Sequence, residues 1–276
     1  MSIPTIIALR ISPVVMALMA ALPASAVTLY DGKQVATVVH EDTPTAALAA
    51  RLLARDLQAV SGVAPKVGTS LADCGRVCIV LGRHDAPQVA KIAADAKLPL
   101  DDLRGQWERY RRAVVPAGAT TYLLIAGSDA RGATWGVVDL TRELGVSSWE
   151  WWADVAPRKQ ASITVDDRAV LSAPPSVKYR GIFLNDEDWG LQPWAARTYY
   201  KAAKDIGPAT YARIYELLWR LKANTIWPAM HDSTKPFYQI AGNPQMARDY
   251  AIVVGTSHAE PMMRNNVREW RKKEDG

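Results

Sequence analysis

The sequence contains little of several residues that often reveal a function. It has only two cysteines, two phenylalanines and four histidines in 276 residues. No Cys-Cys-His cluster is therefore present to bind a structural zinc ion, and the glycines between residues 62 and 136 do not form a GxGxxG dinucleotide-binding loop. The formal charge of +5 is scattered along the chain without a basic stripe. Nucleic-acid binding is therefore not expected.

A long apolar run occurs only at the N-terminus. Arg10 is the only charged residue among the first 26, and the apolar stretch 11–22 follows it. Ala24-Ser25-Ala26 supplies the small-x-small cleavage pattern of a secretory signal peptide, and the run is shorter than the ~20 residues that a membrane span needs. We expect residues 1–26 to be a signal peptide. The mature protein would then be periplasmic or extracellular, with no membrane contact after cleavage.

The two cysteines lie close together, in Cys74-Gly-Arg-Val-Cys78. An exported protein favours a disulfide, which would stabilise the fold by roughly 2 kcal/mol. A straight strand would hold the two sulfurs too far apart, so Gly75-Arg76 must turn for the bond to form. The alternative is two reduced cysteines, with Cys78 packed in a strand. Neither arrangement is catalytic.

Residues 27–173 have the pattern of one α/β domain, in which strands alternate with helices. A helix is expected to start at Asp42-Thr43-Pro44, because a capping residue precedes proline in the first turn. Such alternation favours a sheet covered by helices. No nucleophile motif or phosphate loop occurs, so we expect a non-catalytic accessory domain. The other expected elements are strands at 35–39, 77–81 and 122–125 and a helix that ends at Gly145.

The adjacent prolines of Ser172-Ala-Pro-Pro-Ser176 mark the expected domain boundary. Residues 174–276 then alternate as three strand–helix units, which is the opening of a (β/α)8 barrel. A complete barrel needs eight units and about 250 residues, so we expect a truncated barrel and a chain that is part of a longer protein. The expected strands are 179–184, 225–227 and 252–255, and the expected helices start at Pro208, Pro244 and Met262.

Polar and aromatic side chains follow each of these three strands, where a barrel carries its active site. Carboxylates can act there as acid, base, hydroxyl-binding group or metal ligand, and tryptophan suits the apolar face of a sugar ring. A solvated acidic loop is the alternative for the first group. A metal site built from Asp186, His231, Asp232, His258 and Glu260 is another, although no pair has a metal-motif spacing. The candidates are Asn185, Asp186 and Glu187 after the first strand, Trp227 and His231 after the second, and His258 and Glu260 after the third.

In these segments the chain resembles glycoside hydrolase family 115, the xylan α-glucuronidases. The resemblance rests on Arg180-Gly-Ile-Phe-Leu-Asn-Asp-Glu-Asp188, Leu221-Lys-Ala-Asn-Thr-Ile-Trp-Pro-Ala-Met230 and Gly255-Thr-Ser-His-Ala-Glu-Pro-Met262, with Ser128–Gly136 and Ser148–Asp154 in the first domain. It implies removal of glucuronic acid or its 4-O-methyl ether from xylan side chains, with inversion and without a cofactor.

By the same resemblance, Asp186, Trp227, His231 and His258 line the sugar subsite, and glucuronoxylan or glucuronic acid-substituted xylo-oligosaccharides are the substrates. The chain departs from the family pattern at His231, where a tryptophan is expected, and at Ala259, where a second histidine is expected.

Inversion requires two carboxyl groups about 6.5–9.5 Å apart with a water between them. Asp186 and Glu187 are the catalytic candidates, and Asn185, Trp227, His231, His258 and Glu260 are substrate-binding candidates. We expect the missing carboxyl group beyond residue 276, so the isolated chain should not release glucuronic acid. A non-catalytic carbohydrate-binding remnant and a metal-dependent barrel hydrolase are the alternatives. The oligomeric state, including a homodimer of the full-length protein, stays open.

Overall fold

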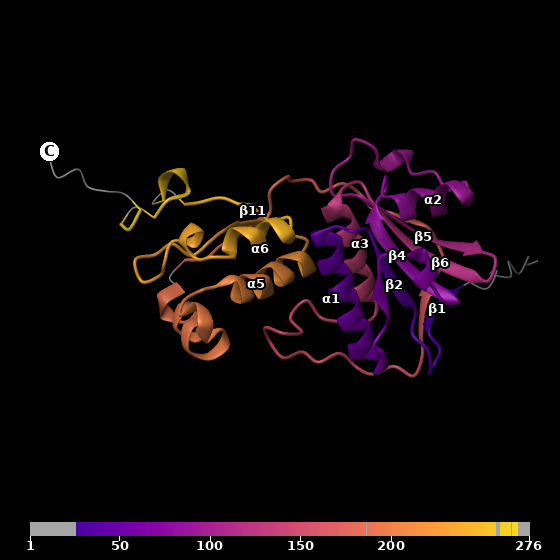
Figure 1. The fold of residues 1–276 in the computed structure, drawn as a ribbon, viewed down its shortest axis with the longest axis horizontal. Coiled ribbons are helices and arrows are strands. Elements are labelled where there is room, and N and C mark those ends of the chain that lie inside the picture. The colour runs from indigo at the N-terminus through magenta and orange to yellow at the C-terminus, as the bar shows by residue number, and fades with distance from the viewer. Residues whose placement is uncertain (1–25, 186, 258–259, 266, 270–276) are drawn as a thin grey trace, which may run out of the picture.

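The computed structural model describes residues 26–185, 187–257, 260–265 and 267–269. Two groups of elements lie side by side along the long axis of the molecule (Figure 1). The first, indigo to magenta, surrounds a six-stranded sheet, and the second, orange to yellow, surrounds a three-stranded sheet. Residues 1–25 of the expected signal peptide lie outside this description. In the part of the chain that it covers, no helix is long and apolar enough to cross a membrane.

The six-stranded sheet has the strand order β3-β2-β4-β6-β5-β8. β2, β3, β4 and β6 run parallel, whereas β5 pairs antiparallel with both β6 and β8. A separate antiparallel pair joins β1 to β7. The strands are β1 (Ala26–Tyr30), β2 (Thr37–His40), β3 (Val67–Gly68), β4 (Val77–Arg83), β5 (Tyr110–Ala117), β6 (Thr120–Gly127), β7 (Ile163–Asp166) and β8 (Val170–Leu171).

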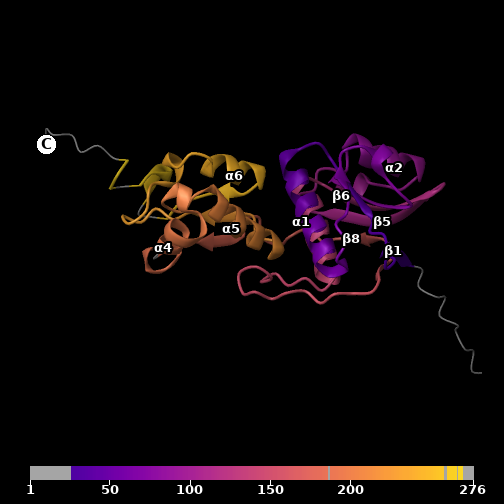
Figure 2. The same ribbon diagram turned by 60° about the horizontal axis from the view of Figure 1, so that its bottom comes forward.

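Helices cover both faces of this sheet, which explains why its central strands are apolar at nearly every position. Alternate side chains such as Ile79 and Leu81 of β4 pack with α1 (Pro44–Ser61) and α3 (Ala130–Glu143), whereas Cys78 and Val80 pack with α2 (Pro87–Asp95). Figure 2 shows α1 and α2 on opposite sides of the strands. The predicted α/β organisation of this region is thus confirmed.

The residues that begin and end α1 are those that the sequence predicts. Thr43 is the N-cap, and its hydroxyl oxygen accepts a hydrogen bond from the Ala46 backbone N–H at 3.4 Å. Pro44 occupies the first turn, where its missing N–H is not needed. The helix ends at Gly62, whose φ of +85° is left-handed and favours glycine.

Cys74 and Cys78 are joined by a disulfide, with their Cα atoms 5.4 Å apart. A 3₁₀ turn over Leu71–Asp73 precedes Cys74, and β4 begins only at Val77. The chain therefore turns between the two cysteines instead of continuing straight, which brings their sulfurs within bonding distance.

The three-stranded sheet is parallel and has the order β11-β10-β9. Its strands are β9 (Gly181–Phe183), β10 (Thr225–Trp227) and β11 (Val253–Val254), with α5 (Pro208–Arg220) between the first two and α6 (Asn243–Asp249) before the third. Gly181 must be glycine, because a Cβ atom there would lie 1.8 Å from the Thr225 carbonyl oxygen. Ile226 is fully buried, whereas Phe183 and Trp227 are each 42% exposed.

The prediction of a helix that starts at Met262 is wrong over the described residues. Between 260 and 269 these contain one 3₁₀ turn, Pro261–Met263, and no α-helix. The Asn265 side-chain oxygen accepts hydrogen bonds from the backbone N–H groups of Val267 and Arg268, at 3.0 and 2.8 Å. Bonds of this kind cap the start of a helical turn, so a turn begins at Asn265. Met262 and Met263 before it have left-handed φ values of +55° and +58°, which a continuous α-helix does not contain.

The two sheets meet end to end, and Glu108 is central to their junction. Its side chain is fully buried and accepts hydrogen bonds from Arg180, Asn224, Arg131 and Trp135. Burial would raise the pKa of Glu108, but the bonds from Arg180 and Asn224 outweigh burial and hold the pKa below its ordinary value. Because Arg180 and Asn224 directly precede β9 and β10, this carboxylate fixes the amino ends of both strands.

Two further bonds fix the segment that leads into β11. The Thr45 hydroxyl donates to the Asp249 carbonyl at 2.8 Å, and the Arg131 Nε donates to the Ala251 carbonyl at 2.7 Å. Thr45 and Arg131 lie in the first turns of α1 and α3, at the carboxyl edge of the six-stranded sheet. This edge, where open α/β sheets commonly bind ligands, therefore holds the second group of elements.

A buried ion-pair network joins α1 to α5. Arg220 donates two hydrogen bonds of 2.9 Å to the two carboxylate oxygens of Asp56, and both side chains are at most 3% exposed. Arg55 and Arg213 pair with Glu216 beside them. Burial would raise the pKa of Glu216, but its bonds and charge interactions with these arginines hold it below the ordinary value.

Candidate functional site

The carboxyl ends of β9, β10 and β11 lie together at one edge of the three-stranded sheet. Phe183 pairs with Trp227 in register, and the Leu184 N–H donates to the Trp227 carbonyl at 2.9 Å. The Gly255 N–H donates to the Ile226 carbonyl at 2.9 Å. The segments that follow the three strands therefore leave the sheet side by side, as expected for parallel neighbours.

Trp227 lies at this edge with 42% of its surface exposed. Its ring contacts Phe183 edge to face, with centroids 5.5 Å apart and planes at 64°. Gly255 lies against the other part of the indole, because a Cβ atom there would be 2.6 Å from the Trp227 Nε1. The indole is thus held by a phenylalanine and a glycine, and neither Phe183 nor Gly255 was among the predicted site residues.

Glu187 is buried beneath this edge, with 3% of its surface exposed. Its Oε1 accepts hydrogen bonds from the His231 backbone N–H at 2.8 Å and from the Thr234 hydroxyl at 3.0 Å. The carboxylate therefore ties the segment after β9 to the segment after β10. This geometry supports a positioning role for Glu187, a role that the sequence did not reveal.

His231 is half exposed and lies beside an acidic neighbour. Its Nδ1 is 3.8 Å from the Asp188 Oδ1 and 3.4 Å from the Ser233 hydroxyl. A protonated His231 would form an ion pair with Asp188, and a neutral ring would offer a donor and an acceptor to a ligand. The site thus places an imidazole and a carboxylate close to the Glu187-bound loop.

The third strand contributes less to the described site. The Glu260 carboxylate accepts a hydrogen bond from the Ser257 hydroxyl, so it turns back toward its own segment. It does not cap the 3₁₀ turn that follows it. Asn185 is exposed at the end of the first segment. Asp186 and His258 lie outside the described residues, so their predicted roles stay predictions.

The described residues contain no group of three or more histidine, cysteine, aspartate or glutamate side chains arranged to hold a metal ion. Two of the five residues in the metal alternative, Asp186 and His258, lie outside that description. Among the others, His231 and Glu260 have the protein partners given above, Asp188 and Ser257.

Residues 172–276 match the family model of glycosyl hydrolase family 115. Among solved structures, the chain is similar to a family GH115 4-O-methyl-α-glucuronidase with specificity for decorated arabinogalactans: 38% identity and a TM-score of 0.75, covering 86% of this chain and 30% of that one. A β-hexosaminidase of Streptomyces plicatus has 15% identity and a TM-score of 0.48, over 84% of this chain and 42% of its own. No curated protein matches.

The chain thus spans about 30% of the length of the glucuronidase that it matches. That alignment covers most of the chain, and the family match contains all three strand ends described above. The chain belongs to glycosyl hydrolase family 115.

Proposed function

We propose that the chain forms the opening part of an α-glucuronidase that removes glucuronic acid or its 4-O-methyl ether from side chains of a plant polysaccharide. The observation that carries this proposal is the partly exposed Trp227 at the carboxyl edge of three parallel strands, inside the family-matched region. Glucuronoxylan is the proposed substrate. The relative's specificity for decorated arabinogalactans makes a decorated arabinogalactan the second substrate to test.

The three parallel strands are, in this proposal, the first strands of a (β/α)8 barrel that begins near residue 174, after an accessory domain at 27–173. Two observations support it. Phe183 and Trp227 are exposed on a sheet face that a closed barrel would cover, and the chain spans only about 30% of its glucuronidase relative. The remaining strands would then supply the second catalytic carboxyl group and a cation for the uronate.

Within the site, Trp227 would stack on the uronic acid ring, and Asn185, His231, His258 and Glu260 would bind its hydroxyl groups. Asp186 is the proposed acid or base. In an inverting reaction the acid gives its proton to the glycosidic oxygen, while the base removes a proton from the attacking water. Glu187 meets neither description well, because its Oε1 already accepts two hydrogen bonds from the loop after β10.

Export from the cytoplasm is part of the same proposal. The apolar stretch before Ala24-Ser25-Ala26 supports a signal peptide, and the Cys74–Cys78 disulfide fits an oxidising compartment. A periplasmic or extracellular enzyme would also have access to plant polysaccharide.

Glu187→Gln separates a positioning role from a catalytic one. Glutamine keeps a side-chain carbonyl that can accept from the His231 N–H, so kcat should stay within roughly tenfold of the parent enzyme if Glu187 only positions the loop. Loss of a general acid or base would instead lower kcat by about 10²–10⁴. Glu187→Ala removes the acceptor, and we expect it to lower the free energy of unfolding by about 2 kcal/mol. A kcat that collapses in Glu187→Gln while the fold is kept would contradict the positioning role.

The activity itself is tested with the mature protein isolated from its source organism, with its intact mass measured alongside. Release of glucuronic acid or its 4-O-methyl ether from glucuronoxylan is measured by chromatography, with and without a chelator. We expect release by a form long enough to complete the barrel, and no release by a chain that ends at residue 276. Chelator-sensitive release would favour a metal-dependent hydrolase. Binding without release by every form would favour the carbohydrate-binding remnant. The absence of both binding and release would refute the proposal.

A further inference from the structure

A second candidate binding site lies far along the chain from the strand ends, at the amino edge of the six-stranded sheet. A cavity of about 290 Å³ opens there between the turn before β2, the loop before β3 and the start of β4. We call it the amino-edge pocket; its lining includes Thr28, Lys33, Gln34, Thr37 and Arg76. Ligand pockets usually measure about 300–1,000 Å³, so this volume suits a ligand the size of one sugar unit.

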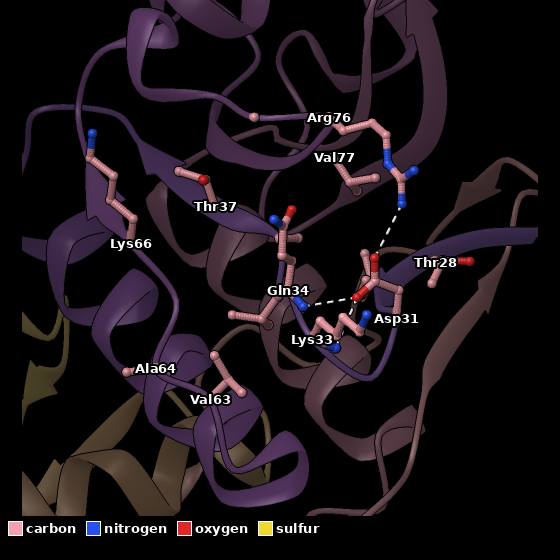
Figure 3. Close-up of a pocket in the computed structure, with 14 residues that line it drawn as sticks. Thr28, Asp31, Lys33, Gln34, Thr37, Val63, Ala64, Lys66, Arg76 and Val77 are labelled. Carbon is pink, nitrogen blue, oxygen red and sulfur yellow. Dashed lines mark hydrogen bonds and ion pairs between the residues drawn. The ribbon is translucent and has the colours of Figure 1, made fainter.

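The lining of the pocket combines apolar side chains with cations. Val35, Val63 and Val77 contribute to the lining. Figure 3 shows Lys66 and Arg76 on opposite sides of the pocket, with Gln34 and Thr37 between them. Small-molecule sites likewise combine apolar side chains with polar groups that fix the orientation of the ligand.

Several polar groups of the lining are not used within the protein. Among the residues that the structure describes, the side chains of Thr28, Lys33, Gln34 and Thr37 have no hydrogen-bond or ion-pair partner. These groups are two hydroxyls, one amide and one ammonium. Together they offer donors to a carboxylate and both donors and acceptors to sugar hydroxyls.

Arg76 is positioned by one ion pair that leaves most of its N–H donors free. It is exposed, and one of its terminal nitrogens donates to the Asp31 carboxylate at 3.2 Å. Asp31 is itself fixed by the backbone N–H groups of Lys33 and Gln34, at 3.0 and 2.8 Å (Figure 3). A guanidinium has five N–H donors, so Arg76 keeps donors for a second carboxylate. The single acidic side chain of the lining is thus already neutralised.

We propose that the amino-edge pocket binds a carboxylated sugar, with Arg76 and Lys33 on the carboxylate and Gln34 and Thr37 on the hydroxyls. The basis is the pocket's own chemistry, so the inference is independent of the glucuronidase assignment and goes beyond it. A second site of this kind would hold an acidic polysaccharide to the region outside the strand-end site.

The test is titration of the ¹⁵N-labelled mature protein with D-glucuronate, D-glucose and acetate, followed by NMR. Glucuronate should shift the amides of residues 28–37 and 75–77 with a Kd of roughly 1 mM. Glucose lacks the carboxylate and acetate lacks the hydroxyls, so each should bind these amides at least about tenfold more weakly.

Arg76→Gln should weaken glucuronate binding about tenfold, and Thr37→Val should weaken it by a smaller factor. Arg104→Gln is the matched control, because Arg104 is as exposed as Arg76, pairs with one aspartate at 3.4 Å and lies outside the pocket. An equal loss of glucuronate affinity in both arginine variants would show a general charge effect and overturn the proposal. Equal shifts with acetate would reduce the site to an anion site, which also overturns it. Shifts confined to the amides around Trp227 would refute this inference while supporting the proposed function.

Discussion

Asp56→Asn should lower the free energy of unfolding by about 3 kcal/mol, as should Arg220→Met. Each change removes one partner of a pair that is almost fully buried and bonded through both carboxylate oxygens. The remaining buried charge would then keep only longer contacts: Arg220 with Glu150 and Glu216 at 3.4 and 3.5 Å, or Asp56 with Arg55 at 3.8 Å. Burial already raises the pKa of Asp56 against the opposing effect of Arg220, so removing Arg220 would favour the protonated acid.

The double variant Asp56→Leu/Arg220→Met tests whether the loss of stability comes from leaving one buried charge without its partner. Replacing a whole buried pair by apolar side chains is often close to neutral, so the double variant should recover much of the loss. Asp95→Asn is the matched control, because it removes one charge from the exposed Lys91–Asp95 pair, which contributes little. Urea unfolding of the mature protein measures the free energy of unfolding of all four variants. Single losses below about 1 kcal/mol would contradict a buried, well-bonded pair.

Trp227→Ala should weaken binding of a glucuronic acid-substituted xylo-oligosaccharide by roughly 30-fold, or about 2 kcal/mol. The indole is the largest partly exposed apolar surface that the described strand ends place at this edge. Trp149→Ala is the control, because Trp149 is similarly exposed, at 48%, and lies outside the strand ends. The proposed subsite would be refuted if calorimetry gave the two variants equal affinity for the oligosaccharide.

Gly255→Ala tests the orientation of the same indole without removing it. The added Cβ would lie 2.6 Å from the Trp227 Nε1, a distance that forces the ring to move. We therefore expect weaker binding than in the parent protein but stronger binding than in Trp227→Ala. Unchanged affinity in Gly255→Ala would mean that the indole position does not matter for the ligand.

The elements that the sequence predicted well are those with a local cause. The helix after Asp42-Thr43-Pro44 begins where a cap and a proline require it, and α5 begins at Pro208 after Gly207. Strand β10 lies at Thr225–Trp227, as predicted. In these places the capping residue, the proline and the apolar run all favour the same structure. The element can therefore be predicted without knowledge of distant contacts.

The elements that were missed depend on distant partners. Strand β5 runs from Tyr110 to Ala117 and pairs along its whole length with β6. It contains Arg111 and Arg112 beside each other, and Arg112 is buried because Glu143 of α3 binds it. A sequence pattern does not show that partner, and residues 110–117 were not among the expected strands.

The site shows the same limit. Trp227 and His231 were predicted from their positions after a strand, and the structure places both at the sheet edge. The burial of Glu187 could not be predicted, because its two hydrogen-bond partners, His231 and Thr234, lie more than forty residues later. Gly255 was read only as part of a motif, whereas its contact with the indole depends on the register of β11 against β10.

The bonds of Glu108, Thr45 and Arg131 have a consequence for the order in which the molecule folds. All three residues belong to the first-synthesised part of the chain, and their partners immediately precede β9, β10 and β11. Domains made early during synthesis can fold before the rest of the chain emerges. The six-stranded sheet would then act as a template on which each later strand is set in register at its amino end. The carboxyl ends, which carry the site, would then be joined last, through bonds such as those of Glu187 to the loop after β10.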